Sequence, residues 1–323
     1  MKYLITGGAG FIGSNIAFEI LKRGDSVRIL DNFATGRRVN LEPIIDQIEL
    51  VDGDIRDFWT VSAAVEGVDY VLHQAALPSV ARSVKNPLTT NAVNIDGTLN
   101  VLEASRQAGV RRVVYACSSS IYGESEVLPK VETMKPSPLS PYAVTKLAGE
   151  EYCKVFYLLY GLETVSLRYF NIFGPRQDPN SQYSAVIPLF IKAVLRHKSP
   201  IVYGDGEQSR DFTYIANAVS ANLNACTAPD APGRCYNVAC GERFTLNQII
   251  KILGEIVGRD VAAKYVDARP GDIKHSLADI TTARNDLDYS PDFDFKSGLK
   301  LTFEWFTKVF SAQTPVGGIK IGE

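Results

Sequence analysis

Along the first half of the chain, short apolar runs rich in β-branched residues alternate with longer stretches in which apolar residues recur every three or four positions. This pattern predicts β-strands at 2–6, 26–31, 69–73 and 113–117, and helices at 11–24, 93–109 and 143–160. The runs at 69–73 and 113–117 are almost wholly apolar, as expected of strands covered on both faces. The pattern therefore predicts βαβ units and a parallel sheet.

The pattern changes after Gly174. Residues 174–184 are rich in Pro, Asn and Ser, as loops are, and shorter elements with isolated charged motifs follow them. We therefore predict a first domain at 1–174 and a smaller α/β lobe at 175–323. The sequence contains no internal repeat and no low-complexity tract.

Composition and charge narrow the function classes. The chain has 323 residues, with 34 Lys and Arg against 36 Asp and Glu, and its net charge of −2 gives no reason to expect nucleic acid or an anionic membrane as a partner. No apolar run approaches the roughly 20 residues of a membrane span, and the chain starts with a strand pattern rather than that of a signal peptide. Five cysteines without Cys-x-x-Cys spacing indicate a reducing cytoplasm. We therefore expect a soluble, cytoplasmic protein.

A glycine-rich turn follows the first predicted strand. Gly8, Gly10 and Gly13 in "ITGGAGFIGSN" have the G-x-G-x-x-G spacing and stand where the first predicted helix begins. Glycines here permit a tight turn, close approach of the backbone to a pyrophosphate and close packing of helix on strand, while the helix N-terminus offers N–H donors. Such turns also occur for purely structural reasons. In this βα context the turn predicts a dinucleotide site in a Rossmann-type, doubly wound parallel sheet.

The acid that ends the second predicted strand indicates which dinucleotide binds. Asp31 follows the last motif glycine by close to the ~20 residues at which an acid meets the ribose 2′-hydroxyl. This favours NAD, because a 2′-phosphate would be repelled, although Arg37 and Arg38 keep NADP open. Asp54 follows a further short strand between those at 26–31 and 69–73 and could meet the adenine amino group, and residues 73–79 bring small side chains to the end of the strand at 69–73.

A tyrosine and a lysine lie one helical turn apart at the start of the third predicted helix. Residues i and i+4 are helix neighbours, so we expect the Lys146 ammonium to lie near the Tyr142 phenol. Lowering the phenol pKa from about 10 by about three units would make Tyr142 a base for an alcohol proton, and a nearby cation has this effect. An isolated match is more often a partly exposed helical pair. The serine run 118–120 adds a hydroxyl, and these groups with a dinucleotide indicate hydride transfer at a secondary alcohol.

Four motifs spread over most of the chain carry a family resemblance. "GGAGFIG", "CSSSIYG", "YAVTK" and "RYFNIFGPRQDP" resemble motifs of the extended short-chain dehydrogenase/reductases and, within them, the nucleotide-sugar 4-epimerases, most of all the UDP-N-acetylglucosamine 4-epimerases. The resemblance implies that Ser118 is the catalytic hydroxyl, with Ser119 and Ser120 as near alternatives. Tyr142 would be the base, and Lys146 its electrostatic partner and a ribose ligand.

The resemblance also implies the residues that contact cofactor and substrate. The implied NAD contacts are Gly7, Gly10, Phe11, Ile12, Asp31, Asn32, Asp54, Ile55, Gln74, Ala75, Ala76, Tyr142 and Lys146. The implied substrate contacts are Ser119, Ser120, Asn171, Val186, Tyr203, Arg210, Arg269, Asp272 and Ser276. Arg210 and Arg269 would hold the diphosphate of a UDP-sugar, because guanidinium groups bind phosphate oxygens bidentately. Asp272 would meet the UDP ribose, and Tyr203 and the stretch 180–188 would lie along the uridine. We expect no metal site, because the histidines are too scattered: His73, His197 and His275.

The implied activity is 4-epimerisation of a UDP-sugar, in which tightly bound NAD takes a hydride from C4 and returns it to the other face of a transient 4-keto sugar. Ser276 stands where glucose/galactose-restricted members carry a tyrosine, so room for an N-acetyl group is expected. UDP-GlcNAc and UDP-GalNAc are therefore the expected pair, with UDP-Glc and UDP-Gal also used. Serines 119 and 120 replace the acidic pair of the related 4,6-dehydratases, so dehydration is not expected. The alternatives are an epimerase restricted to non-acetylated sugars, a UDP-glucuronate 4-epimerase and a non-catalytic NAD-sensing protein.

The helix at 143–160 is apolar nearly all round in its second half. Such a helix should be buried on more than its sheet side. The resemblance implies a homodimer in which two helices of each subunit form a four-helix bundle, and burial under the protein's own loops is the alternative.

Overall fold

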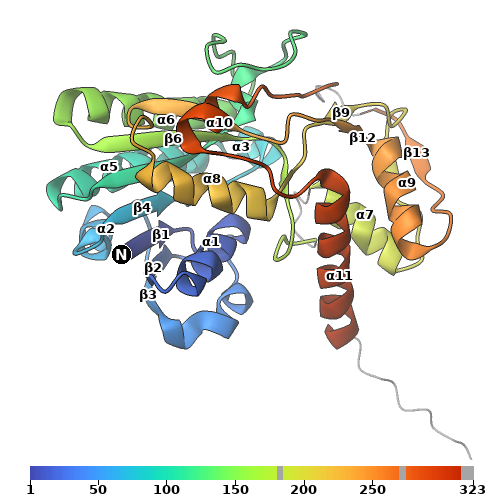
Figure 1. Ribbon diagram of the computed structural model, residues 1–323, viewed down its shortest axis with the longest axis horizontal. Helices are drawn as coiled ribbons and strands as arrows, with labels where there is room; N and C mark the ends of the chain where they lie inside the picture. The colour runs from blue at the N-terminus through green and yellow to red at the C-terminus, as the bar shows by residue number, and fades with distance from the viewer. Residues whose placement is uncertain (180–184, 269–273, 314–323) are drawn as a thin grey trace, which may run out of the picture.

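The computed structural model describes residues 1–179, 185–268 and 274–313, and its centre is a seven-stranded sheet in the order β11-β6-β5-β4-β1-β2-β3 (Figure 1). Each neighbouring pair of these strands is parallel. The strands are β1 (Lys2–Thr6), β2 (Ser26–Asp31), β3 (Ile48–Asp52), β4 (Tyr70–His73), β5 (Arg112–Ser118), β6 (Glu163–Tyr169) and β11 (Arg234–Val238). The strand order reverses direction between β1 and β4, which is the point where doubly wound sheets bind ligands. The predicted fold class is confirmed.

Helices cover both faces of this sheet. α1 (Phe11–Lys22) and α8 (Ile215–Thr227) pack on each other over one face, while α2 (Phe58–Val65), α5 (Gly97–Gln107) and α6 (Pro141–Tyr160) pack in a row over the other (Figure 1). α3 (Val80–Lys85), α4 (Pro87–Asn91) and a π-helical turn (Ala92–Asp96) lead into α5. Shorter 3₁₀ turns lie at Arg38–Asn40, Glu42–Gln47 and Ser119–Tyr122. Because both faces are covered, every residue of β4 is buried, as its apolar run predicts.

The start of α6 is determined locally. The Ser140 hydroxyl accepts a hydrogen bond from the backbone N–H of Ala143 at 3.1 Å, and Pro141 occupies the first helical position. Both features stabilise a helix N-terminus, the first by satisfying an otherwise unpaired N–H and the second by its preset φ. Gly161 ends the helix in the left-handed conformation, with φ of 69°. These signals place Tyr142 and Lys146 in the first turns of the helix.

A second group of elements stands beside the sheet (Figure 1). It contains the helices α7 (Val186–Leu195), α9 (Leu246–Val257) and α11 (Phe295–Gln313). Three two-stranded sheets accompany them: β8 (Ile201–Tyr203) with β13 (Lys264–Val266), β9 (Ser209–Arg210) with β12 (Phe244–Thr245), and β7 (Ile172–Phe173) with β10 (Thr213–Tyr214). Contacts among Phe173, Phe212, Phe244 and Phe295 form its aromatic centre.

After passing through this second group, the chain returns to the seven-stranded sheet and its helices. α8 packs on α1, β11 adds the seventh strand beside β6, and α10 (Thr281–Leu287) packs on β11. Beyond Gly174 the chain therefore contributes elements both to the seven-stranded sheet with its helices and to the second group. The site described below draws residues from both. Among the residues that the structure describes, no helix has the length and apolar character needed to cross a membrane.

Candidate active site

The glycine-rich turn joins β1 to α1 with backbone contacts that leave no room for side chains. Gly7 has a φ of 70°, which favours glycine, and an added Cβ there would lie 2.7 Å from the Ala75 Cα. A Cβ on Gly13 would lie 2.4 Å from the Gly7 carbonyl oxygen. The helix start at Gly10 has no side-chain cap, so the first N–H groups of α1 are available to an anion. This cradle fits the pyrophosphate of a dinucleotide.

The carboxylate that ends β2 is held at the far side of the cradle. Asp31 is buried, and its oxygens accept hydrogen bonds from the backbone N–H groups of Ala9 at 2.9 Å and Phe33 at 2.8 Å. Burial raises the pKa of Asp31, while these two hydrogen bonds lower it. Each carboxylate oxygen has a second lone-pair site, so Asp31 retains the capacity to accept a ribose hydroxyl.

Arg37 and Arg38, which left NADP as an alternative cofactor in the sequence analysis, each lie near an acidic side chain. Arg38 pairs with Asp52 at 2.6 Å and lies over the Phe33 ring, and Arg37 lies 3.6 Å from Asp178. Their charges are thus compensated within the protein, which leaves Asp31 to select against a 2′-phosphate. The residues present fit NAD.

The other predicted cofactor residues lie at the start of α1 and at the carboxyl ends of the strands. Asp54 accepts from Asn32 at 2.7 Å and pairs with Arg56, which is the main reason that its pKa is lowered to about 2. The Ile55 side chain is buried, and its carbonyl accepts from Asn100. Phe11 and Ile12 are the first residues of α1 and are half-buried.

The end of β4 contributes backbone and small side chains. Gln74 donates to Asn222 at 3.0 Å and accepts from Tyr169 at 3.2 Å, so its side chain faces α8 and β6, while Ala75 and Ala76 continue the strand end beside the glycine turn. His73 lies between the hydroxyls of Thr6 and Thr98. Burial lowers the pKa of His73 to about 3, with a smaller contribution from Lys146. This histidine is therefore neutral.

The predicted catalytic groups come together from β5 and α6. Ser118 ends β5, and its hydroxyl accepts a hydrogen bond from the backbone N–H of Ser120 at 3.2 Å. The Ser118 side chain lies close enough to the Tyr142 phenol to lower its pKa, and Lys146 lies one turn further along α6. Lys146 is buried, and its Nζ donates to the Ala116 carbonyl at 2.7 Å. The Ser118 and Tyr142 hydroxyls are therefore neighbours, whereas the ammonium is bound to the backbone of β5.

The prediction that Lys146 lowers the pKa of Tyr142 is wrong in this structure. Burial raises the pKa of Tyr142 to about 12, the hydrogen bond with Ser118 offsets part of this rise, and Lys146 is not among the causes. The reason is geometric, because the ammonium turns beneath the strand to the Ala116 carbonyl and lies 5.0 Å from the Tyr115 ring centre. Burial also lowers the pKa of Lys146 to about 8.

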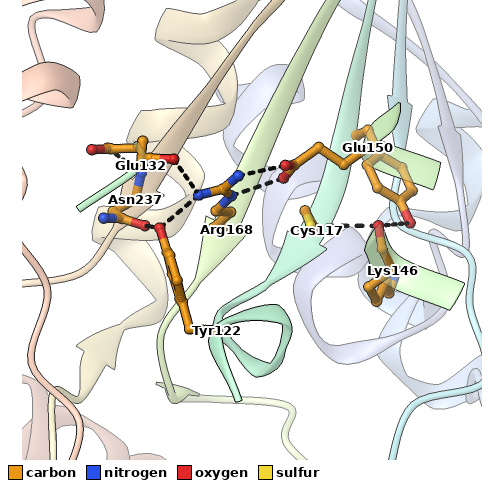
Figure 2. A network of polar contacts seen from close by, with 8 residues as sticks. Cys117, Tyr122, Glu132, Lys146, Glu150, Arg168 and Asn237 are labelled. Carbon is orange, nitrogen blue, oxygen red and sulfur yellow. Dashed lines mark hydrogen bonds and ion pairs between the residues drawn. The ribbon is translucent and has the colours of Figure 1, made fainter. Parts of the chain in front are cut away.

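A buried polar network behind these groups holds α6 against the sheet (Figure 2). Arg168 on β6 pairs with Glu150 on α6, and both side chains are buried. Arg168 also donates to the Tyr122 hydroxyl at 2.8 Å, which donates to Asn237 on β11 at 2.7 Å. Cys117 lies on the same side, with its Sγ 3.6 Å from the Lys146 carbonyl. Sequence reasoning missed this network, although a charged residue in the apolar run "SLRYF" was a signal for it.

A cavity of about 250 Å³ lies within the second group of elements, lined by residues of β7, α7, β9 and α9 and of the segments next to them. The predicted substrate residues Asn171, Val186 and Arg210 line it. Ala185 and Ile187, which also line it, belong to the stretch 180–188 that the sequence predicts to lie along the uridine. Sequence reasoning missed the remaining lining residues, which are Ile172, Phe173, Gln208, Phe212 and Leu246. Tyr203, at the end of β8, is not among its lining residues in the described part of the chain, and its carbonyl accepts from Gln208 at 2.6 Å.

Ser276 is not among the lining residues of this cavity in the described structure, but it contacts Asn171, which is one of them. The Asn171 side-chain amide lies 3.4 Å from the Ser276 hydroxyl and donates to the Asp211 carbonyl at 3.0 Å. Asn171 holds this position with a φ of 39°, in the left-handed region where asparagine is tolerated better than most residues. The predicted contacts Arg269 and Asp272, and residues 180–184, lie outside the described residues. Ser119 and Ser120 lie in the 3₁₀ turn after Ser118, and the Ser120 hydroxyl is buried without a hydrogen-bond partner in the described structure.

Possible metal ligands are not clustered in the described ranges: no group of three or more His, Cys, Asp and Glu side chains there could hold an ion.

Comparisons with known proteins extend over nearly the whole chain. Residues 3–239 match the sequence model described as the NAD dependent epimerase/dehydratase family. A protein of Mycolicibacterium smegmatis named UDP-glucose 4-epimerase is 35% identical over 310 residues, covering 95% of this chain and 98% of its own.

Solved structures are also similar. The UDP-N-acetylglucosamine 4-epimerase from Methanobrevibacter ruminantium M1, in complex with UDP-N-acetylmuramic acid, is 41% identical with a TM-score of 0.91, covering 95% of this chain and 98% of its own. The UDP-glucuronic acid 4-epimerase from Bacillus cereus, in complex with UDP-glucuronic acid and NAD, is 32% identical with a TM-score of 0.88, covering 96% of this chain and 100% of its own.

Proposed function

The chain belongs to the NAD dependent epimerase/dehydratase family, and we propose that it is a UDP-sugar 4-epimerase that interconverts UDP-GlcNAc and UDP-GalNAc, and also UDP-Glc and UDP-Gal. One observation supports the proposal most directly: the Ser118 side chain lies near the Tyr142 phenol, one helical turn from the buried Lys146, in a chain whose glycine turn fits the pyrophosphate of NAD. When bound in that groove, NAD supplies the acceptor for one hydrogen and two electrons from C4 and gives them back, so no net oxidation results.

The protein's own side chains handle the proton of the sugar 4-hydroxyl. Tyr142 accepts it, directly or through Ser118, and returns it after the sugar has presented its other face. Because the Tyr142 pKa is about 12 in this structure, the phenolate needs added positive charge to form near neutral pH. The Lys146 ammonium, one turn further along α6, donates to the Ala116 carbonyl in this structure and does not supply that charge in this arrangement.

The residues after Ser118 argue against dehydration of the sugar. The related 4,6-dehydratases carry an acidic pair at these two positions, whereas this chain has Ser119 and Ser120. A neutral hydroxyl with an ordinary high pKa is a poor general acid or base for eliminating water. The keto sugar is therefore expected to be reduced again rather than dehydrated.

Sugar selectivity is proposed to depend on the size of residue 276. We expect Ser276→Tyr to lower kcat/KM for UDP-GlcNAc and UDP-GalNAc by roughly 5 to 150-fold, since overpacking typically costs about 1 to 3 kcal/mol. The pair UDP-Glc and UDP-Gal, measured with the same protein, is the internal control and should change little. Assaying product formation from each of the four sugars tests the function and the selectivity together.

Two results would contradict these assignments. If Ser276→Tyr lowers kcat/KM equally for both pairs, Ser276 does not gate the pocket. If the wild type epimerises UDP-glucuronate and none of the four neutral UDP-sugars, the proposed substrate class is wrong.

We also propose that the protein acts in the cytoplasm as a homodimer joined through α6. The outer face of α6 exposes apolar side chains that neither the sheet nor the protein's own loops cover: Val144 is 49% exposed, Val155 40%, Leu158 67% and Leu159 70%. Burying such a stripe against a second copy gains about 25 cal/mol for each Å² removed from water. All five cysteines are free thiols, as a reducing compartment allows.

Charge on this stripe is expected to separate the subunits. The double variant Val155→Glu, Leu159→Glu should sediment as a monomer where the wild type sediments as a dimer, because carboxylates in an apolar interface lose hydration without gaining partners. Ile201→Glu is the matched control, since Ile201 is also an exposed apolar residue, at 51%, but lies on β8 in the second group of elements. A monomeric wild type would refute the proposal.

A further inference from the structure

A carboxylate that takes no part in the chemistry above lies between the substrate residues. Asp211 follows Arg210 and is wholly buried. Its Oδ1 accepts from the Cys240 N–H at 2.9 Å, and its Oδ2 accepts from the N–H groups of Gly241 at 3.0 Å and Ala278 at 3.2 Å. One side chain thus joins two segments that are distant in sequence, the turn after β11 and the segment 274–279.

The segment 274–279 carries Ser276. At one end the Asp211 carboxylate binds the Ala278 N–H, beside a backbone bridge in which the Lys130 N–H donates to the Leu277 carbonyl at 2.8 Å and the Asp279 N–H donates to the Lys130 carbonyl at 2.9 Å. At its other end it is paired with β9: the Ser209 N–H donates to the Lys274 carbonyl at 3.0 Å, and the Ser276 N–H donates to the Ser209 carbonyl at 3.0 Å. Asn171, which reaches the Ser276 hydroxyl, donates to the main-chain carbonyl of Asp211. Asp211 therefore contacts the segment that carries Ser276 and also Asn171, which lines the cavity.

The pKa and the hydrogen bonds of Asp211 fit a structural carboxylate rather than a general acid or base. Burial raises the pKa of Asp211 to about 6, and the three backbone N–H groups oppose that rise. At neutral pH the side chain is therefore ionised, and hydrogen bonds to an ionised acceptor are roughly twice as strong as neutral ones. Both oxygens already accept hydrogen bonds from the protein, so substrate contact is not needed to satisfy the charge.

We propose that Asp211 is a positioning residue for the sugar pocket, whose carboxylate holds segment 274–279, and with it Ser276, in place against Asn171. This inference rests on the proposed function, because it treats the cavity beside Asn171 as the sugar-nucleotide site. Ser118, Tyr142 and Lys146 lie on β5 and α6, which Asp211 does not contact through these bonds. Loss of the carboxylate should therefore affect substrate binding more than turnover.

The test is Asp211→Asn, which keeps the shape and replaces one acceptor oxygen by an amide NH₂, so that at least one of the three N–H groups faces another donor. We expect KM for UDP-GlcNAc to rise about tenfold or more while kcat stays within about threefold of wild type, because a buried charge-assisted bond is lost away from the reacting atoms. Asp294→Asn is the matched control: that exposed carboxylate also accepts a backbone N–H, from Ser297 at 2.7 Å, and its loss should leave both constants unchanged.

A positioning role and a general structural role give different results. Unchanged kcat and KM in Asp211→Asn would overturn the proposal, and so would a parallel loss of kcat, cofactor and melting temperature. Binding of UDP-GlcNAc measured by calorimetry in the Tyr142→Phe background, with and without Asp211→Asn, separates this proposal from the proposed function. Equal affinity in the two proteins refutes only the role of Asp211, whereas no binding to either refutes the proposed function.

Hydrogen exchange of the wild-type protein tests whether Asp211 holds the segment 274–279. It requires no activity assay and no variant. The amides of Cys240, Gly241 and Ala278 should exchange at least about a hundredfold more slowly than exposed amides, because their acceptor is buried. Fast exchange of the Ala278 amide would show that Asp211 does not hold the segment, whatever the substrate proves to be.

Discussion

Tyr142→Phe is expected to fold, to keep its cofactor and to lose turnover by a factor of about 10² to 10⁴, the usual contribution of a positioned general base. The substitution removes one oxygen, which lies near the Ser118 side chain, and keeps the aromatic ring. Nothing else in the described site can replace it near the serine, since the Lys146 ammonium is directed to the Ala116 carbonyl. The measurement is kcat for UDP-GlcNAc, with circular dichroism and bound nucleotide determined on the same preparation.

Tyr157→Phe is the matched control for this result. Tyr157 lies on the same helix and is 37% exposed, so it loses the same oxygen away from the cavity and should keep wild-type kcat. If Tyr142→Phe retains more than about a tenth of kcat, well above what loss of a general base allows, then Tyr142 is not the base.

Gly13→Ala is expected to leave a folded protein with less than about a tenth of the wild-type cofactor content, since overpacking usually costs only about 1 to 3 kcal/mol of stability. The new Cβ would lie 2.4 Å from the Gly7 carbonyl oxygen and 2.8 Å from the Gly8 Cα. Both contacts are with backbone, so α1 has to move away from β1, and its N–H groups leave the pyrophosphate position. The wild type should release NAD when it is denatured, and the variant should release little.

Gly254→Ala controls for the added methyl group. Gly254 is also a helical glycine, in α9, where a Cβ would meet its nearest neighbour at 3.1 Å and alanine favours the helix. The cofactor content of Gly254→Ala, measured by chromatography of the denatured protein, should equal that of the wild type.

Two outcomes would contradict these roles. NADP as the main nucleotide released by the wild type would refute the role given to Asp31, and full NAD content in Gly13→Ala would refute the role given to the glycine turn.

The sequence by itself determined the elements and the cofactor groove, because both depend on short-range patterns. Apolar runs such as 69–73 predict strands covered on both faces, and β4 and β5 are such strands. The glycine turn and Asp31 follow from spacing along one βαβ unit, whose handedness allows one arrangement. The pairing of Tyr142 with Lys146 on one helix, and the serine at the end of β5, also follow from local position.

The pKa values of these groups and their hydrogen-bond partners were decided only by the tertiary structure. The pKa of Tyr142 depends on how deeply the phenol is buried and on where the Lys146 ammonium turns, and neither can be deduced from their spacing on a helix. Arg168 and Glu150 meet because β6 and α6 pack together, and Asp211 reaches Ala278 across 67 residues of sequence. The seventh strand, β11, likewise joins the sheet after a long excursion through the second group of elements. The physical reason is that a local pattern records which residues are apolar or conformationally special, whereas burial, charge and hydrogen bonding depend on neighbours that come from distant segments.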